Sequence, residues 1–192
     1  ILALRNAVLF PTAVFHITIG REMSIKLIRD VENGNGFLGA VPQIDVTVEN
    51  PKKNDLFKYG TVAKIIKTLE MPDGTITAIL QGYKRIEVMD VITYDPYMQA
   101  NVHYLNDIVP DDNDDSVKAI SSALKEKAAA IIRSSNFAPK EAVGALMTID
   151  SFQFLVNFIA TTIDVEEFKD KYILLGFADL KERAMNLLTV LE

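Results

Sequence analysis

The chain has 192 residues, of which 49% are apolar and 24% are charged, and these proportions are ordinary for a globular protein. No apolar run approaches the roughly 20 residues that cross a bilayer, and no secretory signal stands at its start, so neither kind of segment is expected. Cysteine is absent, which excludes disulfides, thiolate metal sites and cysteine nucleophiles.

Charge is unevenly distributed along the sequence. Residues 1–105 contain 11 Lys and Arg against 11 Asp and Glu, whereas residues 106–192 contain 9 against 15, which accounts for the formal charge of −6. A general nucleic-acid binder needs a basic surface, because phosphate contacts supply most of its affinity. No basic surplus is visible, so nucleic acid is an unexpected partner.

The first part of the chain has the patterns of short strands and one helix. Leu2 to Leu4 predicts a short strand, and the alternating residues from Ala13 to Ile19 predict a second. From Met23 to Val31 the apolar spacing becomes helical, and Asn33-Gly34 predicts the end of this helix. A compact apolar run from Phe37 to Val41 predicts a buried strand.

The next segment is polar and leads into the most distinctive part of the chain. Residues 43–55 are expected to form a surface loop, in which Asp55 caps one helical turn through Phe57. A β-hairpin follows from Tyr59, with its reversal at Met71-Pro72-Asp73-Gly74, where Pro and Asp-Gly supply the φ angles of a tight turn. Beyond the kink at Gln81-Gly82-Tyr83, further strands are expected over residues 84–93 and 98–105.

Residues 106–116 are expected to form an acidic, solvated linker, and everything after them is helical in pattern. The sequence thus predicts a β-rich domain over residues 1–105 and a helical subdomain over 117–192, an α+β protein. One face of the first long helix is apolar, through Val117, Ile120, Leu124 and Ile131.

Four further helices are expected in the second domain. Pro139 suits the first turn of a helix that runs to about Met147. Three later helices are predicted over residues 151–162, 165–175 and 180–191. Each is preceded by an aspartate three residues before Gln or Glu, the spacing of a reciprocal N-terminal cap, at Asp150, Asp164 and Asp179.

Candidates for catalysis or metal binding are few. His16 and His103 lie in predicted strands without partner residues at ligand spacing, so half-exposed strand positions are the simpler interpretation. The sequence has no P-loop for ATP and no GxSxG or SxxK pattern for a serine nucleophile. The acidic cluster at residues 111–115 lacks the Gly and the distal Glu of a calcium loop, which favours a solvated linker.

Apolar residues at predicted turns are the more informative feature. Leu69, Met71 and Pro72 lie at the tip of the hairpin, while Phe10, Pro11 and Met23 lie beside bends. Exposed apolar side chains, Met especially, can bind extended or unfolded peptides through adaptable contacts. The alternative is that these residues pack within the protein, because single apolar residues at a surface are common.

Several motifs occur together in a recognisable order. They are LRNAVLFP near the start, ITIGREMSIKLI, DLFKYGTVAKIIKTLEMPDGT and ILQGYKRIEV. Together they resemble the N-terminal domain of the ATP-dependent Lon protease, densely from Leu2 to Val88 and more loosely over the helical half. The resemblance implies a six-stranded PUA-like pseudo-barrel followed by a helical bundle.

The resemblance also implies a function. In the whole protease this region helps to recognise substrate proteins and supports hexamer assembly, while ATP and Mg²⁺ belong to a separate ATPase module and cleavage to a Ser-Lys peptidase module. The chain is therefore expected to be non-catalytic and to need no cofactor. Its expected partners are unfolded or misfolded proteins and other subunits of a Lon hexamer, in the cytoplasm and without a membrane.

A second candidate contact surface comes from the GRExSIK segment of the family. It matches this chain at Gly20, Arg21, Glu22, Ser24, Ile25 and Lys26, with Met23 where the family usually has lysine. We therefore take Arg21, Glu22, Met23 and Lys26 as candidate substrate-binding residues beside the hairpin tip. A solvated helix start is the structural alternative for the charged members of this set.

Two other functions stay open at this point. The first is a stand-alone LON-domain adaptor, because some proteins carry the same fold without ATPase or peptidase modules. The PUA-like fold binds RNA in other proteins, but fold analogy alone is a poor guide to function, and the charge distribution argues against it.

Overall fold

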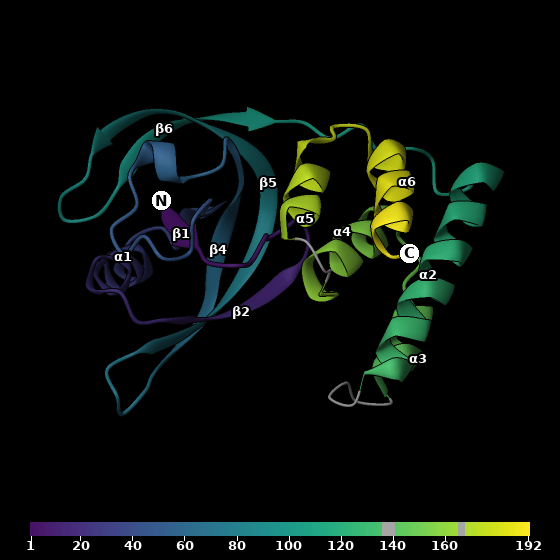
Figure 1. The fold of residues 1–192 in the computed structure, drawn as a ribbon, viewed down its shortest axis with the longest axis horizontal. Coiled ribbons are helices and arrows are strands. Elements are labelled where there is room, and N and C mark those ends of the chain that lie inside the picture. The colour runs from purple at the N-terminus through teal and green to yellow at the C-terminus, as the bar shows by residue number, and fades with distance from the viewer. Residues whose placement is uncertain (136–140, 165–167) are drawn as a thin grey trace. The chain divides into compact units, whose positions relative to one another are not determined.

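The computed structural model describes residues 1–135, 141–164 and 168–192, and it divides into two compact units (Figure 1). The first unit spans Ile1–Asn106 and contains all the named strands, and the second spans Asp107–Glu192 and contains five of the six named helices. The α+β class predicted from the sequence is confirmed. Each unit has its own buried apolar residues, and we describe them separately.

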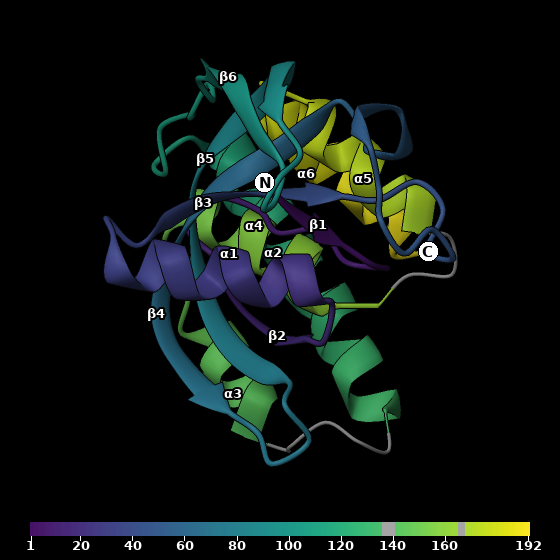
Figure 2. The same ribbon diagram turned by 90° about the vertical axis from the view of Figure 1, so that its left-hand side faces the viewer.

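The first unit is a six-stranded sheet that curls into an open pseudo-barrel, with one helix lying across it (Figure 2). The strand order is β1-β3-β4-β5-β2, and β6 also pairs with β5. Its elements are β1 (Leu2–Leu4), β2 (Val14–Ile19), α1 (Glu22–Asn33), β3 (Phe37–Pro42), β4 (Tyr59–Glu70), β5 (Ile76–Thr93) and β6 (Gln99–Leu105).

The longest strand, β5, organises the barrel. It pairs with β4 along most of its length, and on its other side it pairs with β2 through residues 76–81 and with β6 through residues 85–93. The sequence predicted two strands separated by a kink, but β5 is continuous. The kink is a register shift in which Tyr83 is the extra residue, since Ala63 pairs with Gly82 and Val62 with Lys84.

The other strands and the helix predicted for the first unit are present, and the placements of Asp55 and Phe10 are corrected. In β2, Phe15, Ile17 and Ile19 face the core, and α1 ends with Gly34 at its C-cap, as predicted. Asp55 does not begin a helical turn; it ends the short 3₁₀ helix Lys53–Asp55 and accepts a hydrogen bond from the Lys52 amide at 2.7 Å. Phe10, placed beside a bend, is fully buried in the core.

The second unit is a helical bundle. Its helices are α2 (Asp115–Ser134), α3 (Glu141–Met147), α4 (Phe152–Thr162), α5 (Phe168–Gly176) and α6 (Leu180–Val190). Val117 and Leu124 of the predicted apolar face of α2 are buried, and Asp114 caps this helix by accepting from the Ser116 amide. The helices predicted to end near Met147 and to run over residues 165–175 are present as α3 and α5. Pro139 and residues 165–167 lie outside the described residues, so the Pro139 start and the Asp164 cap stay predictions.

Of the two other helix caps that the structure tests, the one predicted for α4 is wrong and the one predicted for α6 is confirmed. Ser151, rather than Asp150, caps α4 and accepts from the Phe154 amide, because the helix begins one residue later than the Asp-to-Gln spacing predicts. Asp179 caps α6 as predicted and accepts from the Lys181 and Glu182 amides. A short side chain with a hydroxyl or carboxylate group at the N-cap accepts hydrogen bonds from backbone amides that have no partner inside the helix.

From Asp107 onward, the segment predicted to be a solvated linker belongs to the second unit and is only partly solvated. Asp107 has a side chain only 8% exposed and forms an ion pair with Arg183 at 3.0 Å. Ile108 forms a parallel bridge with Asp179, and Asp112 accepts a hydrogen bond from the Phe152 amide. These contacts attach the segment to the bundle, which spacing and composition alone do not show.

Candidate functional site

The hairpin between β4 and β5 ends in a well-defined turn. The Met71 amide donates to the Thr75 carbonyl at 2.8 Å, and the Gly74 amide donates to the Met71 carbonyl at 3.0 Å. Asp73 Oδ1 accepts from both the amide and the hydroxyl of Thr75, at 2.9 and 2.7 Å. Gly74 has φ +84°, which only glycine adopts without strain, so the Asp-Gly signal of the sequence is confirmed here.

Apolar side chains on this hairpin are exposed to solvent. Of the predicted residues, Leu69 is 59% exposed, Met71 is 39% exposed and Pro72 lies on the surface beside it. Ile66, which sequence reasoning missed, is 52% exposed. A second register shift, between Ile65 and Lys67, gives the strand an extra residue there, and no sequence signal marked that position.

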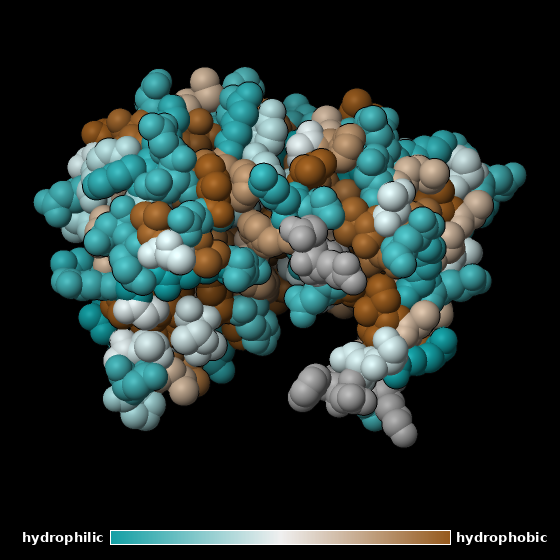
Figure 3. Space-filling model, viewed as in Figure 1, coloured by the Kyte–Doolittle hydropathy of each residue, from teal (hydrophilic) through white to brown (hydrophobic). Residues whose placement is uncertain are grey.

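We call residues 66–75 the hairpin arm. β3 pairs with β4 only through Thr61–Lys64, so beyond Lys64 the arm continues without that neighbour and projects from the barrel (Figure 1). In Figure 3 the arm lies at the lower left, with hydrophobic residues among hydrophilic ones. Apolar residues on a projecting arm are typical of a surface that contacts another polypeptide.

The C-terminal half of helix α1 contacts the hairpin arm through two side-chain interactions. Arg29 forms an ion pair with Glu70, with 2.8 Å between Nη2 and Oε1, and Thr68 donates to Glu32 at 2.6 Å. Arg29, Glu32 and Glu70 are exposed and Thr68 is half-buried, so the ion pair contributes little to the free energy of folding. Their effect is to fix which way the base of the arm points relative to α1.

The other candidate residues lie at the opposite end of α1. Arg21, at the N-cap, turns inward and donates to Gln43 Oε1 at 2.7 Å and to the Val48 carbonyl at 3.4 Å. Partial burial, then the neighbouring Arg5 guanidinium, lower the pKa of Arg21 from its ordinary value, without removing its charge. Gln43, which holds Arg21 in place, is itself completely buried.

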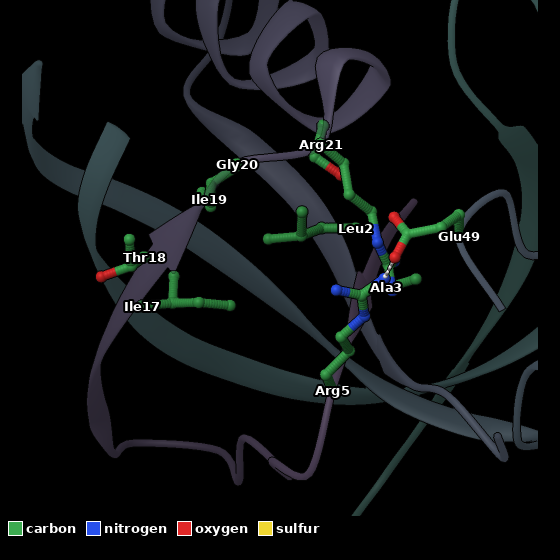
Figure 4. A pocket seen from close by; sticks show the side chains of 10 residues that line it. Leu2, Ala3, Arg5, Ile17, Thr18, Ile19, Gly20, Arg21 and Glu49 are labelled. Carbon is green, nitrogen blue, oxygen red and sulfur yellow. Dashed lines mark hydrogen bonds and ion pairs between the residues drawn. The ribbon is translucent and has the colours of Figure 1, made fainter. Parts of the chain in front are cut away.

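Arg21 also borders a cleft of about 250 Å³ between β2 and the start of α1 (Figure 4). Arg5 projects into the same cleft and pairs with Glu49 at 2.7 Å. The arginines therefore already have oxygen partners inside the protein. This arrangement favours a role for Arg21 in fixing the loop of residues 43–49 against α1.

The remaining residues of that segment face different surroundings. Glu22 and Lys26 are exposed and form an i,i+4 ion pair at 2.9 Å, which lowers the pKa of the Glu22 carboxyl and raises that of the Lys26 ammonium. Met23 is half-buried and borders a second, smaller depression that Arg21 also lines. The structure thus does not gather these four residues and the hairpin tip into one site.

Groups that could carry chemistry are sparse in the described part of the chain. No three His, Asp or Glu side chains there are grouped to hold a metal ion, and His16 and His103 are exposed on strands. No helix among the described residues is long and apolar enough to cross a membrane. The arrangement, a barrel with a projecting arm that exposes apolar side chains, is typical of a protein-binding module.

Comparison with known proteins identifies the family. Residues 1–192 match the model of the ATP-dependent protease La (LON) substrate-binding domain. The chain is 45% identical over 188 residues to the Lon protease of Flavobacterium johnsoniae and 41% identical over 192 residues to that of Cytophaga hutchinsonii. These alignments cover 98% and 100% of this chain but only 23% and 24% of the relatives, so the chain spans about a quarter of their length.

Solved structures show the same fold. The N-terminal domain of the Mycobacterium avium complex Lon protease superimposes with a TM-score of 0.76 over 99% of this chain and 95% of that one, at 16% sequence identity. The Lon N-terminal domain protein from Xanthomonas campestris gives 0.64 over 97% and 95%, also at 16% identity. The chain belongs to the Lon substrate-binding domain family, which confirms the resemblance found in the sequence.

Proposed function

We propose that this chain recognises and holds unfolded or misfolded proteins for an ATP-dependent Lon-type serine protease and does not cut them itself. The observation that carries the proposal is the hairpin arm, where Ile66, Leu69 and Met71 are 52%, 59% and 39% exposed. Unfolded chains expose apolar side chains that a folded protein buries, and an exposed apolar arm discriminates between the two states. Met71 adds a flexible side chain that adapts to different partners.

The family supports the wider setting of this proposal. The Flavobacterium johnsoniae and Cytophaga hutchinsonii relatives carry the name Lon protease, and the chain spans about a quarter of their length. This favours a module of a protease over a stand-alone adaptor. In this setting ATP and Mg²⁺ belong to a separate ATPase module and cleavage belongs to a Ser-Lys peptidase module. Other Lon subunits are partners in a hexamer, and the compartment is the bacterial cytoplasm. RNA binding is disfavoured by the formal charge of −6.

A binding comparison tests the proposal. The purified chain is titrated against one fluorescently labelled protein in two forms, native and permanently unfolded, and binding is followed by anisotropy. The proposal predicts saturable binding of the unfolded form and none of the native form, with neither ATP hydrolysis nor peptide cleavage. Binding of the native form alone would contradict it, and tight salt-sensitive binding of RNA would favour the RNA-binding alternative.

A further inference from the structure

An apolar cleft on the first unit is separate from the hairpin tip. It has a volume of about 310 Å³ and lies among α1, β3, β4, β5 and β6, where α1 crosses the barrel in Figure 2. We call it the aromatic cleft. Its lining includes Phe37, Val62, Ile86, Tyr97, Val102 and Tyr104. No charged side chain is among those that line it.

Strand register explains how these side chains come to share a face. Ile86 of β5 is paired with Tyr104 of β6, and two residues earlier Lys84 is paired with Val62 of β4. Val62 is in turn paired with Gly39 of β3. Residues opposite each other in a sheet, and residues two apart along a strand, point to the same side.

Gly39 lines the cleft and leaves room for two neighbouring isoleucine side chains. A Cβ atom built there would lie 2.9 Å from Ile1 Cδ1 and 3.1 Å from Ile86 Cδ1, so any side chain would press on the lining. With glycine at this position, the Ile1 and Ile86 side chains pack directly against the β3 backbone and form part of the apolar lining. The volume is at the lower end of the range for ligand sites, which fits one large side chain better than a cofactor.

The rim of the cleft carries exposed aromatic rings and two lysines. Phe37 is 40% exposed and Tyr104 is 55% exposed. The ammonium of Lys64 is 5.7 Å from the centre of the Phe37 ring, and that of Lys84 is 6.0 Å from the Tyr104 ring. Both distances are within the range of cation–π attraction, which holds positive charge beside the aromatic rim.

The α1 side of the cleft has an acidic neighbour that is already engaged. Tyr97 donates its hydroxyl hydrogen to Asp30 at 3.0 Å, so this carboxylate accepts a hydrogen bond from the lining itself. The sheet side, with Lys64 and Lys84, is therefore the side that attracts an incoming carboxylate. This local charge is opposite in sign to the formal charge of the whole chain, −6.

We propose that the aromatic cleft binds a large apolar side chain of an unfolded protein segment whose neighbouring residues are acidic. The apolar side chain is buried against Ile86 and Val62, while flanking carboxylates approach Lys64 and Lys84. The inference rests on the proposed function, because it assigns a preferred sequence chemistry to the unfolded partner. It adds a second contact, with its own specificity, to the hairpin arm.

Three labelled disordered peptides test the inference by anisotropy. The first has a central Phe flanked by Asp, the second has the same Phe flanked by Lys, and the third has Ser in place of Phe between the same Asp residues. We expect the chain to bind the first peptide about tenfold more tightly than either of the others. The net charge of the chain alone would favour the Lys-flanked peptide. A preference for the Asp-flanked peptide therefore indicates the positive charge at the rim of the cleft.

Variants locate the effect. Lys64→Glu with Lys84→Glu should reverse the order of the two Phe peptides, because both lysines are exposed and can be replaced without disturbing the core. Tyr104→Ser should weaken both Phe peptides about fivefold by removing the rim ring. The matched control, Lys53→Glu with Lys118→Glu, makes the same change in net charge at exposed positions outside the cleft and should keep the wild-type order.

The outcomes separate this inference from the proposed function. If the wild type binds unfolded protein but prefers the Lys-flanked peptide, or if the cleft variants and the control behave alike, the cleft proposal is wrong and the arm proposal stands. If the wild type binds neither unfolded protein nor any peptide, both proposals are wrong. A reversal confined to the Lys64→Glu, Lys84→Glu variant, with an unchanged circular dichroism spectrum, supports the cleft.

Discussion

Asp107 and Arg183 form a buried ion pair, with 3.0 Å between Oδ2 and Nη1 and with side chains 8% and 0% exposed. Arg183 also donates to Asn157 Oδ1 at 2.8 Å and to the Phe177 carbonyl at 2.6 Å through Nη2. The guanidinium thus joins the first residue of the second unit to α4 and to the segment before α6. Taking a charge out of water is costly, and these oxygen partners offset that cost.

Removal of one member of this pair should destabilise the chain strongly. Asp107→Ala leaves the Arg183 charge buried without its carboxylate, and we expect the free energy of unfolding to fall by about 3–5 kcal/mol in urea denaturation. Lys127→Ala, which breaks an exposed pair with Glu192, is the control and should cost less than about 1 kcal/mol. An equal fall in the free energy of unfolding in the two variants would mean that the buried ion pair stabilises the chain no more than the exposed one.

Gly82 should be intolerant of a side chain for a different reason, which is close approach of the backbone. A Cβ atom there would lie 2.3 Å from the Phe10 carbonyl oxygen, in a region where the Gly82 amide donates to Ala13 and its carbonyl accepts from Thr12. We expect Gly82→Ala to lower the free energy of unfolding by about 1–3 kcal/mol.

Gly144 in α3 provides the matched control for Gly82. A Cβ atom at Gly144 would meet nothing within 4 Å, so Gly144→Ala should be neutral or stabilise the chain by up to about 1 kcal/mol through helix propensity. Both variants are compared by thermal and urea unfolding. If Gly82→Ala proved as stable as Gly144→Ala, the predicted close contact with Phe10 would be refuted.

The turn of the hairpin arm should respond to acid. The hydroxyl of Thr75, and then its amide, lower the pKa of the Asp73 carboxyl below its ordinary value of 3.8. A group whose pKa is depressed on folding contributes stability above its unfolded pKa, and that contribution is lost as pH falls through the folded pKa. We expect an NMR titration of Asp73 to give a midpoint below 3.8, which Thr75→Val moves upward. An unchanged midpoint in Thr75→Val would contradict the assigned cause.

Local sequence patterns predicted most of the elements because their causes are local. The Asp-Gly turn, the glycine that ends α1 and the alternation in β2 each depend on a few adjacent residues. The predicted element boundaries were wrong where a contact with a residue far along the chain determines the local structure. Gly82 looked like a break between strands because its function, close contact with Phe10, involves residues about seventy positions earlier.

The buried polar residues and the cleft were missed for the same reason. Arg183 and Lys171 are charged residues of ordinary appearance, yet they are buried because carbonyl or carboxylate partners surround them; Lys171 donates to Thr161 and Ile163 carbonyls at 2.8 and 3.0 Å. The aromatic cleft combines side chains from five elements, so no single stretch indicates it. By contrast, the exposure of Leu69 and Met71 followed from their place at a predicted turn.

The most direct test of the account compares two methionines on the first unit. Met71 on the arm is 39% exposed and Met89 near the far end of β5 is 41% exposed, so Met→Asp is a matched change at the two positions. Each variant, with an unfolding curve to confirm its fold, is titrated against the labelled unfolded protein. We predict that Met71→Asp weakens binding about tenfold or more and that Met89→Asp changes it less than about twofold. Equal binding by the two variants would contradict recognition at the hairpin arm.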